Sequence, residues 1–175
     1  VQAGGWSPTY TYTDESGTRF AVEKIQNSNE GFIYAIDIGE NANELVIPES
    51  IDGVAIKGFD TSHVDSGFVF SGFERVTRIT VPKNMGGLPE GWYDSESGIN
   101  GENIESWIYI AENHGMDLSN LEEIVVDAAN PYYTTEGGVL FNKDKTDLLH
   151  YPAAKPGTSY QIPNGVQNIS QYAFQ

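Results

Sequence analysis

A short motif occurs three times along this chain of 175 residues and constrains the fold more than any other feature. Segments 47–59, 81–93 and 162–174 each begin with an apolar residue and a proline, and then place apolar residues three, six and eleven positions after the proline. Chance rarely produces such agreement in a chain with 8 prolines. A recurring unit of this kind is typical of stacked-repeat proteins, in which each unit buries its apolar face against the next.

An apolar-x-apolar-Pro signature marks where each unit is expected to contain a strand. It occurs at 45–48, 79–82, 149–152 and 160–163, and residues 124–127 form a fifth copy that ends in Asp. Side chains alternate along a strand, so the two apolar residues should face inward and the residue between them outward. The proline should end the strand, because it has no N–H to donate. We therefore expect a continuous core made of Leu45, Ile47, Ile79, Val81, Ile124, Val126, Tyr160 and Ile162.

The chain divides into a lead-in and a repeat array. In the lead-in, residues 1–43, the alternation of apolar and polar residues over 9–38 predicts a small antiparallel β cap on the open end of the array. Residues 44–175 form the array, which is interrupted at about 93–120 by an insertion. Helical spacing of apolar residues within the insertion predicts a helix at roughly 103–114. We expect both parts to form one continuous structural domain.

The charge balance restricts the partners that this chain can bind. Lys and Arg together number 9, against 25 Asp and Glu, so the net charge is −16. Such a field repels nucleic acid and anionic lipid, which bind to basic patches, so no nucleic-acid partner is expected. It favours solubility and, beyond that, the attraction of cations or basic partners. No run of 18 apolar residues is present, so no membrane insertion is expected.

The sequence contains no complete catalytic or metal-binding motif. His63, His114 and His150 are far apart and lie outside any metal-binding spacing, so each is interpreted as structural. Segments 94–98 and 142–146 match a calcium loop only in part, and a polar hairpin turn explains the second equally well. We therefore predict no catalytic residue, no cofactor and no metal site. The many carboxylates still leave a glycosidase pair open.

The repeat unit resembles the BspA-type leucine-rich repeats of bacterial surface proteins. Segment 68–82 is similar to the junction of two such repeats, and segments 130–146 and 149–163 are similar to hairpins inserted in that family. The resemblance covers about residues 44–175 and is loosest over 86–118. It implies a mainly β fold with minor helix: an irregular leucine-rich-repeat solenoid preceded by the antiparallel β cap. It also implies an extracellular or cell-surface location, without shared catalytic residues or a shared cofactor.

The outward-facing residues of the repeat strands are the candidate ligand surface. In a leucine-rich-repeat solenoid they line an exposed sheet, which a protein or glycan can contact. A merely solvated sheet face is the alternative. Trp92, Tyr93 and Trp107 in the insertion are expected in the core, whereas Tyr109 lies off the apolar face of the predicted helix. The candidate residues are Arg78, Thr80, Glu123, Val125, His150, Gln161 and Tyr109.

These features predict a non-enzymatic, secreted or cell-surface bacterial module that binds a host or extracellular protein or glycan. The resemblance to the BspA-type family implies this role, since the best-known members of that family are adhesins. A second hypothesis is a structural spacer within a longer surface protein, because the chain stops in mid-repeat at Gln175. A carbohydrate-active enzyme is the third hypothesis, and two carboxylates about 5–10 Å apart in a cleft would support it.

Overall fold

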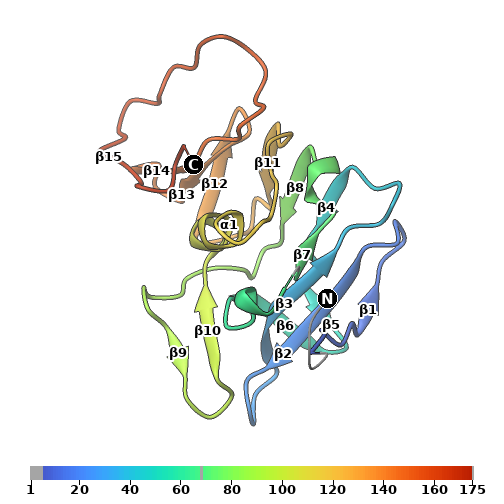
Figure 1. The fold of residues 1–175 in the computed structure, drawn as a ribbon. Helices are drawn as coiled ribbons and strands as arrows, with labels where there is room; N and C mark the ends of the chain where they lie inside the picture. Colours follow the sequence, from blue (N-terminus) through green and yellow to red (C-terminus); the bar gives the residue numbers. More distant parts are fainter. Residues whose placement is uncertain (1–5, 68, 175) are drawn as a thin grey trace.

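The computed structural model describes residues 6–67 and 69–174, which form three β-sheets, one α-helix and two short 3₁₀ helices (Figure 1). Helix α1 lies near the centre of the view, with the four-stranded sheet above it on the left; the eight-stranded sheet lies below it, with β1, β2 and β3 on the right and β9 and β10 on the left. Phe68, at the start of the predicted repeat junction, and Gln175, which motivated the spacer hypothesis, lie outside the described residues.

The eight-stranded sheet is built around β3 and β6. Its strand order is β1-β2-β3-β6-β10-β9, with β5 paired to β6 and β7 paired to β3. The antiparallel meander of β1, β2 and β3 is the one predicted from the alternation over 9–38, and β3 then pairs in parallel with β6 and β7. The strands are β1 (Tyr12–Thr13), β2 (Arg19–Lys24), β3 (Glu30–Asp37), β5 (Ser50–Ile51), β6 (Val54–Asp60), β7 (Phe70–Ser71), β9 (Tyr93–Asp94) and β10 (Ile99–Glu102).

Three of the repeat signatures form a parallel sheet of β4 (Glu44–Val46), β8 (Arg78–Val81) and β11 (Glu123–Val126). The strands pair in register, so that equivalent residues of the signatures lie side by side. Their inward side chains are buried as the alternation predicts, apart from the half-buried Val126. The buried residues of the signatures are Leu45, Ile47, Ile79, Val81 and Ile124.

The four-stranded sheet has its own small core. It consists of β12 (Tyr133–Glu136), β13 (Val139–Asn142), β14 (Asp147–His150) and β15 (Asn168–Ile169), in that order. The first three strands are antiparallel neighbours, and β15 pairs in parallel with β14. Val139, Phe141, Leu148 and Ala173 form its core, so this sheet packs partly on itself.

The predicted helix is confirmed as α1, Ile104–Glu112. Its apolar face is buried, and the ring of Trp107 stacks on Phe59 of β6 with the ring centres 3.9 Å apart. Phe70 and Phe73 contact the same indole edge-on, Phe73 from the 3₁₀ helix η2 (Phe73–Arg75). The other 3₁₀ helix, η1 (Val64–Ser66), follows β6. Helix α1 is therefore held by aromatic packing against the eight-stranded sheet.

Buried Asn130 connects the four-stranded sheet to the parallel sheet. Its side-chain amide donates hydrogen bonds to the carbonyls of Pro82 (2.9 Å) and Met85 (3.0 Å). Its Oδ1 accepts the backbone N–H groups of Tyr132 (2.7 Å) and Tyr133 (3.0 Å). One side chain thereby satisfies four backbone groups, two in the segment after β8 and two at the start of β12, which fixes where the hairpin leaves the parallel sheet.

The predicted continuous solenoid is wrong. The described strands fall into three sheets, and parallel stacking of repeat signatures is confined to β4, β8 and β11. On the outer side of β11, the N–H of Ile124 donates to the carbonyl of Gly138 in the β12–β13 turn, at 2.9 Å. A hairpin satisfies its own backbone groups by antiparallel pairing, so the signature at 149–152 adds to β13 instead of extending the parallel stack.

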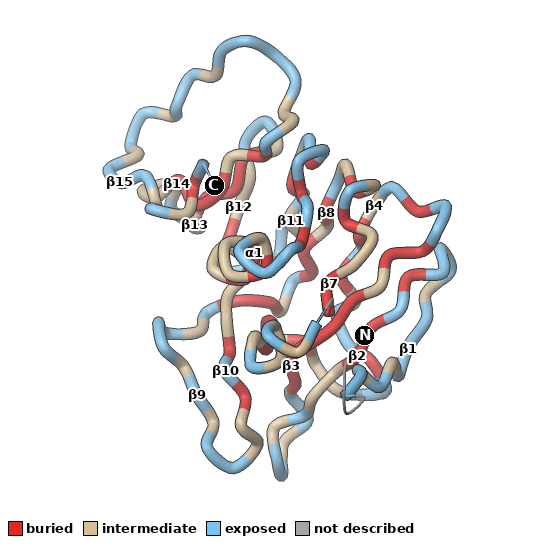
Figure 2. Tube along the Cα trace, viewed as in Figure 1, coloured by how far each residue is buried: buried red, intermediate tan, exposed pale blue. Residues whose placement is uncertain are grey.

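The expected burial of the 160–163 signature is also wrong. The chain between β14 and β15 forms a wide loop without strands, exposed over most of its length (Figures 1 and 2). Ile162 is 40% exposed, and Tyr160 is half-buried with its ring edge-on to Tyr151. Pro152, Pro156 and Pro163 remove three donors from this segment, so it cannot complete a ladder over its full length.

The aromatic residues of the insertion divide between core and surface. Trp107 is fully buried, as predicted. Trp92 is half-buried and stacks on Phe32 of β3 at 4.9 Å between ring centres. Tyr93 is 57% exposed, so its expected core position is wrong. It lies on β9, an edge strand of the sheet that pairs with β10 on one side.

Candidate functional site

The outer face of the parallel sheet carries two rows of side chains across β4, β8 and β11. Because the strands are in register, the residues between the buried apolar positions align from strand to strand. Glu44, Arg78 and Glu123 form the first row, which we call the charged row. Val46, Thr80 and Val125 form the second, which we call the valine row. We refer to the two rows together as the outer face.

The charged row is held by Arg78 at its centre. The guanidinium donates from Nη1 to Glu44 Oε2 at 3.2 Å and from Nε to Glu123 Oε2 at 3.3 Å. Exposed ion pairs of this kind contribute at most about 1 kcal/mol each to stability. Their main effect is therefore to orient the three side chains, leaving one excess negative charge on the row.

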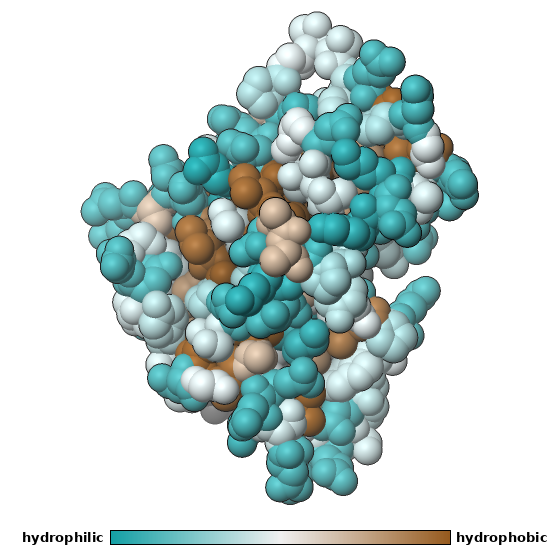
Figure 3. All heavy atoms as spheres, turned by 180° about the vertical axis from the view of Figure 1, so that it is seen from behind, coloured by the Kyte–Doolittle hydropathy of each residue, from teal (hydrophilic) through white to brown (hydrophobic). Residues whose placement is uncertain are grey.

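The valine row exposes apolar surface beside these charges. Val46 is 52% exposed and Val125 is 37% exposed, with the half-buried hydroxyl of Thr80 between them. Figure 3 shows the molecule from behind, with hydrophobic patches emerging from a mostly hydrophilic surface. Exposed β-branched side chains aligned across a sheet can be covered by a partner at little conformational cost, because they have few rotamers to lose.

Four of the seven predicted surface residues lie on the outer face. Arg78, Thr80, Glu123 and Val125 occupy neighbouring positions of β8 and β11, as the strand alternation predicts. Glu44 and Val46 on β4 complete the two rows, and sequence reasoning missed them. The signal was present, since Val46 occupies the same position of its signature as Thr80 and Val125 do in theirs.

The outward orientation expected for His150 is wrong. His150 is 2% exposed on β14, where Leu148 and Leu149 are buried as well. Both faces of β14 are covered at this point, because the C-terminal segment packs over it and the Tyr151 N–H donates to the carbonyl of Ala173 at 2.7 Å. Burial lowers the pKa of His150 to about 4, so the imidazole is neutral near pH 7. It therefore contributes no exposed or charged group to a ligand surface.

Gln161 and Tyr109 are exposed or half-exposed, but they lie away from the outer face. Gln161 is in the loop between β14 and β15. Tyr109 is on helix α1, and its ring centre lies 4.6 Å from that of Tyr172 near the chain end. The seven predicted residues therefore do not form one surface.

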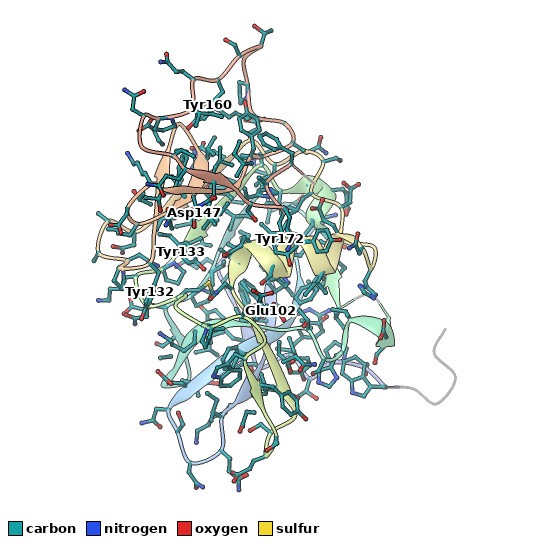
Figure 4. The ribbon with its side chains drawn as sticks, turned by 90° about the vertical axis from the view of Figure 1, so that its left-hand side faces the viewer. Glu102, Tyr132, Tyr133, Asp147, Tyr160 and Tyr172 are labelled. Atoms are coloured by element: carbon teal, nitrogen blue, oxygen red, sulfur yellow. The ribbon has the colours of Figure 1, made fainter. Side chains whose placement is uncertain are left out.

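A cleft of about 680 Å³ opens beside helix α1. The loop at 89–91, the end of β10, the first turns of α1 and residues 170–172 line it. Figure 4 shows Glu102 and Tyr172, two of the lining residues, beside the helix. Glu90 and Glu105 also line it, so three carboxyl groups meet in one hollow.

Two of these carboxyl groups hold their protons more tightly than usual. Burial raises the pKa of Glu102, against a hydrogen bond from Ser106, and the negative charge of Glu90 adds to the rise. Burial also raises the pKa of Glu105, although the Tyr133 hydroxyl donates a hydrogen bond to its Oε1 at 3.1 Å. Both carboxyl groups therefore take up a proton at a higher pH than an ordinary glutamate does.

A further group of side chains carries atoms that can bind a metal. One ligand atom each from Glu23, Asp60 and His63 lies within 4.8 Å of the others. Burial raises the pKa of Glu23 to about 6, with Asp60 adding to the rise and His63 opposing it. Sequence reasoning interpreted His63 as structural, since no short spacing connects these residues and only the fold brings them together.

The two partial calcium-loop matches are turns. Asn142 bridges the β13–β14 turn, donating from Nδ2 to Thr146 Oγ1 at 2.8 Å and accepting the Asp147 N–H at 2.9 Å. In the β9–β10 turn, Asp94 Oδ2 accepts the Ser97 N–H at 3.3 Å. Asn142 Oδ1 and Asp94 Oδ2 thus stabilise the backbone of the two turns.

Comparison with known proteins gives two distant structural neighbours. No family model and no curated protein matches the chain. A leucine-rich repeat protein from Eubacterium ventriosum ATCC 27560 is similar at 28% identity over 75% of this chain, with a TM-score of 0.44. The pneumococcal vaccine antigen PcpA is similar at 13% identity over 96% of this chain, with a TM-score of 0.29.

The chain spans 26% of the length of the Eubacterium protein and 62% of that of the antigen. The first neighbour is a leucine-rich repeat protein by name, and neither name specifies the BspA type. In residues 6–67 and 69–174, no helix is long and apolar enough to cross a membrane.

Proposed function

We propose that this chain is a non-enzymatic binding module of a secreted or cell-surface bacterial protein, and that its outer face binds a protein partner through a basic segment. The observation that supports the proposal is the alignment of an exposed valine row with a charged row on one sheet. The cell-surface location rests on the resemblance of the repeat unit to bacterial surface proteins.

The chemistry of the outer face favours a basic peptide segment as the occupant. The valine row offers apolar surface that a partner can remove from water, which is the main source of affinity at most interfaces. Glu44 and Glu123 are exposed to about two-fifths of their side chains and are already oriented by Arg78. The net charge of −16 attracts a basic partner over long range and accelerates its association.

A matched pair of substitutions tests this assignment. The wild-type chain is first screened on arrays of extracellular matrix proteins and of glycans, and the affinity of the strongest hit is then measured for two variants. Thr80→Arg places a bulky positive charge at the centre of the valine row and should weaken binding at least ~10-fold. Gln161→Arg adds the same charge in the β14–β15 loop and should change the affinity less than ~2-fold.

The outcome separates the proposal from its alternatives. Equal losses in Thr80→Arg and Gln161→Arg would show a general charge effect and contradict a site on the outer face. A strongest hit on the glycan array would contradict a protein partner. Absence of any hit would favour the structural spacer, which needs no coherent surface.

The acidic cleft beside α1 allows a test of the proposal that the chain is not an enzyme. Three glutamates line this cleft, and a carbohydrate-active site would require a pair of carboxyl groups. We expect the wild-type chain to release no sugar from the same glycan array. Release that is abolished by Glu102→Gln would replace the binding-module proposal with the carbohydrate-active alternative.

A further inference from the structure

The eight-stranded sheet brings Glu23, Asp60 and His63 together at the end of β6. Glu23 of β2 pairs with Phe32 of β3, and Phe59 of β6 pairs with Ile33. Side chains alternate along a strand, so Phe59 and Ile33 share one face of the sheet. Asp60 lies on the opposite face, which also carries Phe32 and Glu23. His63 then turns back over the sheet as the residue that precedes η1.

The three side chains present one nitrogen and two oxygens at metal-binding spacing. His63 Nε2 lies 3.2 Å from Glu23 Oε1 and 4.0 Å from Asp60 Oδ2. In a tetrahedral zinc site with bonds of about 2.0–2.2 Å, neighbouring ligand atoms are separated by roughly 3.4 Å. Side-chain rotations of Glu23 and His63, both partly exposed, can supply the small adjustment needed.

Asp60 is the observation that points to a ligand. The residue is fully buried, and its Oδ1 accepts the N–H groups of Ser62 at 2.9 Å and Asn100 at 3.1 Å. Its Oδ2 is buried too, yet has no hydrogen-bond partner within the described part of the chain. A buried carboxylate oxygen without a partner is strongly destabilising, and a cation held with Glu23 and His63 would satisfy it.

Aromatic rings hold the imidazole in place. The ring of Trp6 stacks on His63 with 4.8 Å between the ring centres and 14° between the planes. Tyr34 of β3 contacts the same imidazole at 5.0 Å, and its hydroxyl accepts the N–H of Thr9 at 3.0 Å. Such surrounding contacts fix the orientation of a histidine ligand and limit the access of water, as in established metal sites.

We propose that Glu23, Asp60 and His63 bind one divalent transition metal of the Zn²⁺ class, through Oε1, Oδ2 and Nε2, with the fourth position left to water. A ligand set that mixes imidazole with carboxylate suits Zn²⁺. Ca²⁺ and Mg²⁺ bind six or more oxygens and do not favour imidazole. The bound metal would link β2, the end of β6 and the turn before η1.

Calorimetric titration of the full chain, after treatment with EDTA, tests the site. ZnCl₂ should bind with one ion per chain, and MgCl₂ or CaCl₂ at the same concentrations should give no saturable signal. His63→Ala and Glu23→Gln should each weaken Zn²⁺ binding at least ~10-fold. His114→Ala should change it less than ~2-fold, because His114 pairs with Asp65 at 2.9 Å and no third ligand atom joins this pair among the described residues.

A second readout reports the geometry of the site. Co²⁺ in place of Zn²⁺ should give the visible absorption of a four-coordinate ion, lost in His63→Ala and retained in His114→Ala. If circular dichroism shows that His63→Ala does not fold, Glu23→Gln, whose side chain is about one-third exposed, takes its place. Absence of one-to-one Zn²⁺ binding by the wild-type chain, or equal losses in His63→Ala and His114→Ala, would overturn the proposal.

Discussion

Glu112, the last residue of α1, illustrates how a single side chain can oppose folding. Its Oε1 is buried without a hydrogen-bond partner in the described residues. Burial raises the pKa of this carboxyl from its ordinary value of 4.5 to about 7, and the charge of Asp117 adds to the rise. The C-terminal end of a helix also disfavours a negative charge. The ionised form of Glu112 is therefore less stable in the folded chain than in the unfolded chain.

The pH dependence of stability follows from this raised pKa. Below about pH 4.5 Glu112 is protonated in both states and has no effect, whereas between about 4.5 and 7 the folded state keeps the proton that the unfolded state loses. The contribution of Glu112 to the free energy of unfolding therefore falls as the pH rises through this window, and it stays low above it. Glu112→Gln should stabilise the chain by about 1 kcal/mol at pH 8, a value reduced for solvent screening.

Urea unfolding of Glu112→Gln and wild type at pH 4 and pH 8 measures this difference. The wild-type comparison at each pH cancels the titration of Glu23 and other shared groups. A variant that gains no more stability at pH 8 than at pH 4 would contradict an ionised, partly buried Glu112.

At the scale of elements, two segments with the same apolar-x-apolar-Pro signature adopt different structures. The signature at 79–82 becomes β8, the central strand of the parallel sheet, and Ile79 is fully buried. The signature at 160–163 remains in a loop, with Ile162 40% exposed. The local pattern is the same, so the difference comes from the neighbours: β8 has β4 and β11 on its two sides.

Alanine substitutions should reveal that difference as a difference in the free energy of unfolding. Ile79→Ala should cost about 2–5 kcal/mol, because it leaves a cavity between two packed strands. Ile162→Ala should cost less than about 1 kcal/mol, since an exposed side chain loses little burial. Chemical denaturation followed by circular dichroism measures both values, and equal costs would restore the repeat core that the structure contradicts.

At the scale of the whole molecule, one hydrophobic cluster joins the three sheets to helix α1. Phe20 of the eight-stranded sheet, Ile79 of the parallel sheet and Leu140 of the four-stranded sheet belong to it, together with Trp107 of the helix. Trp107 is its largest fully buried side chain. The insertion that interrupts the repeat array thus supplies part of the core that holds the sheets together.

Two substitutions of Trp107 separate volume from polarity. Trp107→Ala should cost about 3–5 kcal/mol, because it removes the ring packed on Phe59, Phe70 and Phe73. Trp107→Phe should cost only about 1 kcal/mol: it keeps most of the ring and removes Nε1, which has no partner among the residues described. Thermal and urea unfolding monitored by circular dichroism measure the free energy of unfolding of both variants. Equal losses in Trp107→Ala and Trp107→Phe would contradict a role of the ring volume.

The sequence by itself determined the local elements of this protein. Alternation of apolar residues predicted the β1–β3 meander and the buried positions of β4, β8 and β11, and helical spacing predicted α1 within one or two residues of each end. It also located Arg78, Thr80, Glu123 and Val125 on one face. These features depend on side-chain periodicity within a few residues of chain, which is legible without knowledge of the neighbours.

Only the tertiary structure decided which elements meet. The parallel stack ends at β11 because a hairpin, not another repeat strand, lies beside Ile124. His150 is buried because the chain end packs over β14, and Glu23, Asp60 and His63 converge because β2 and β6 flank β3. Contacts of this kind join residues far apart along the chain, and their energy depends on packing that no local pattern encodes.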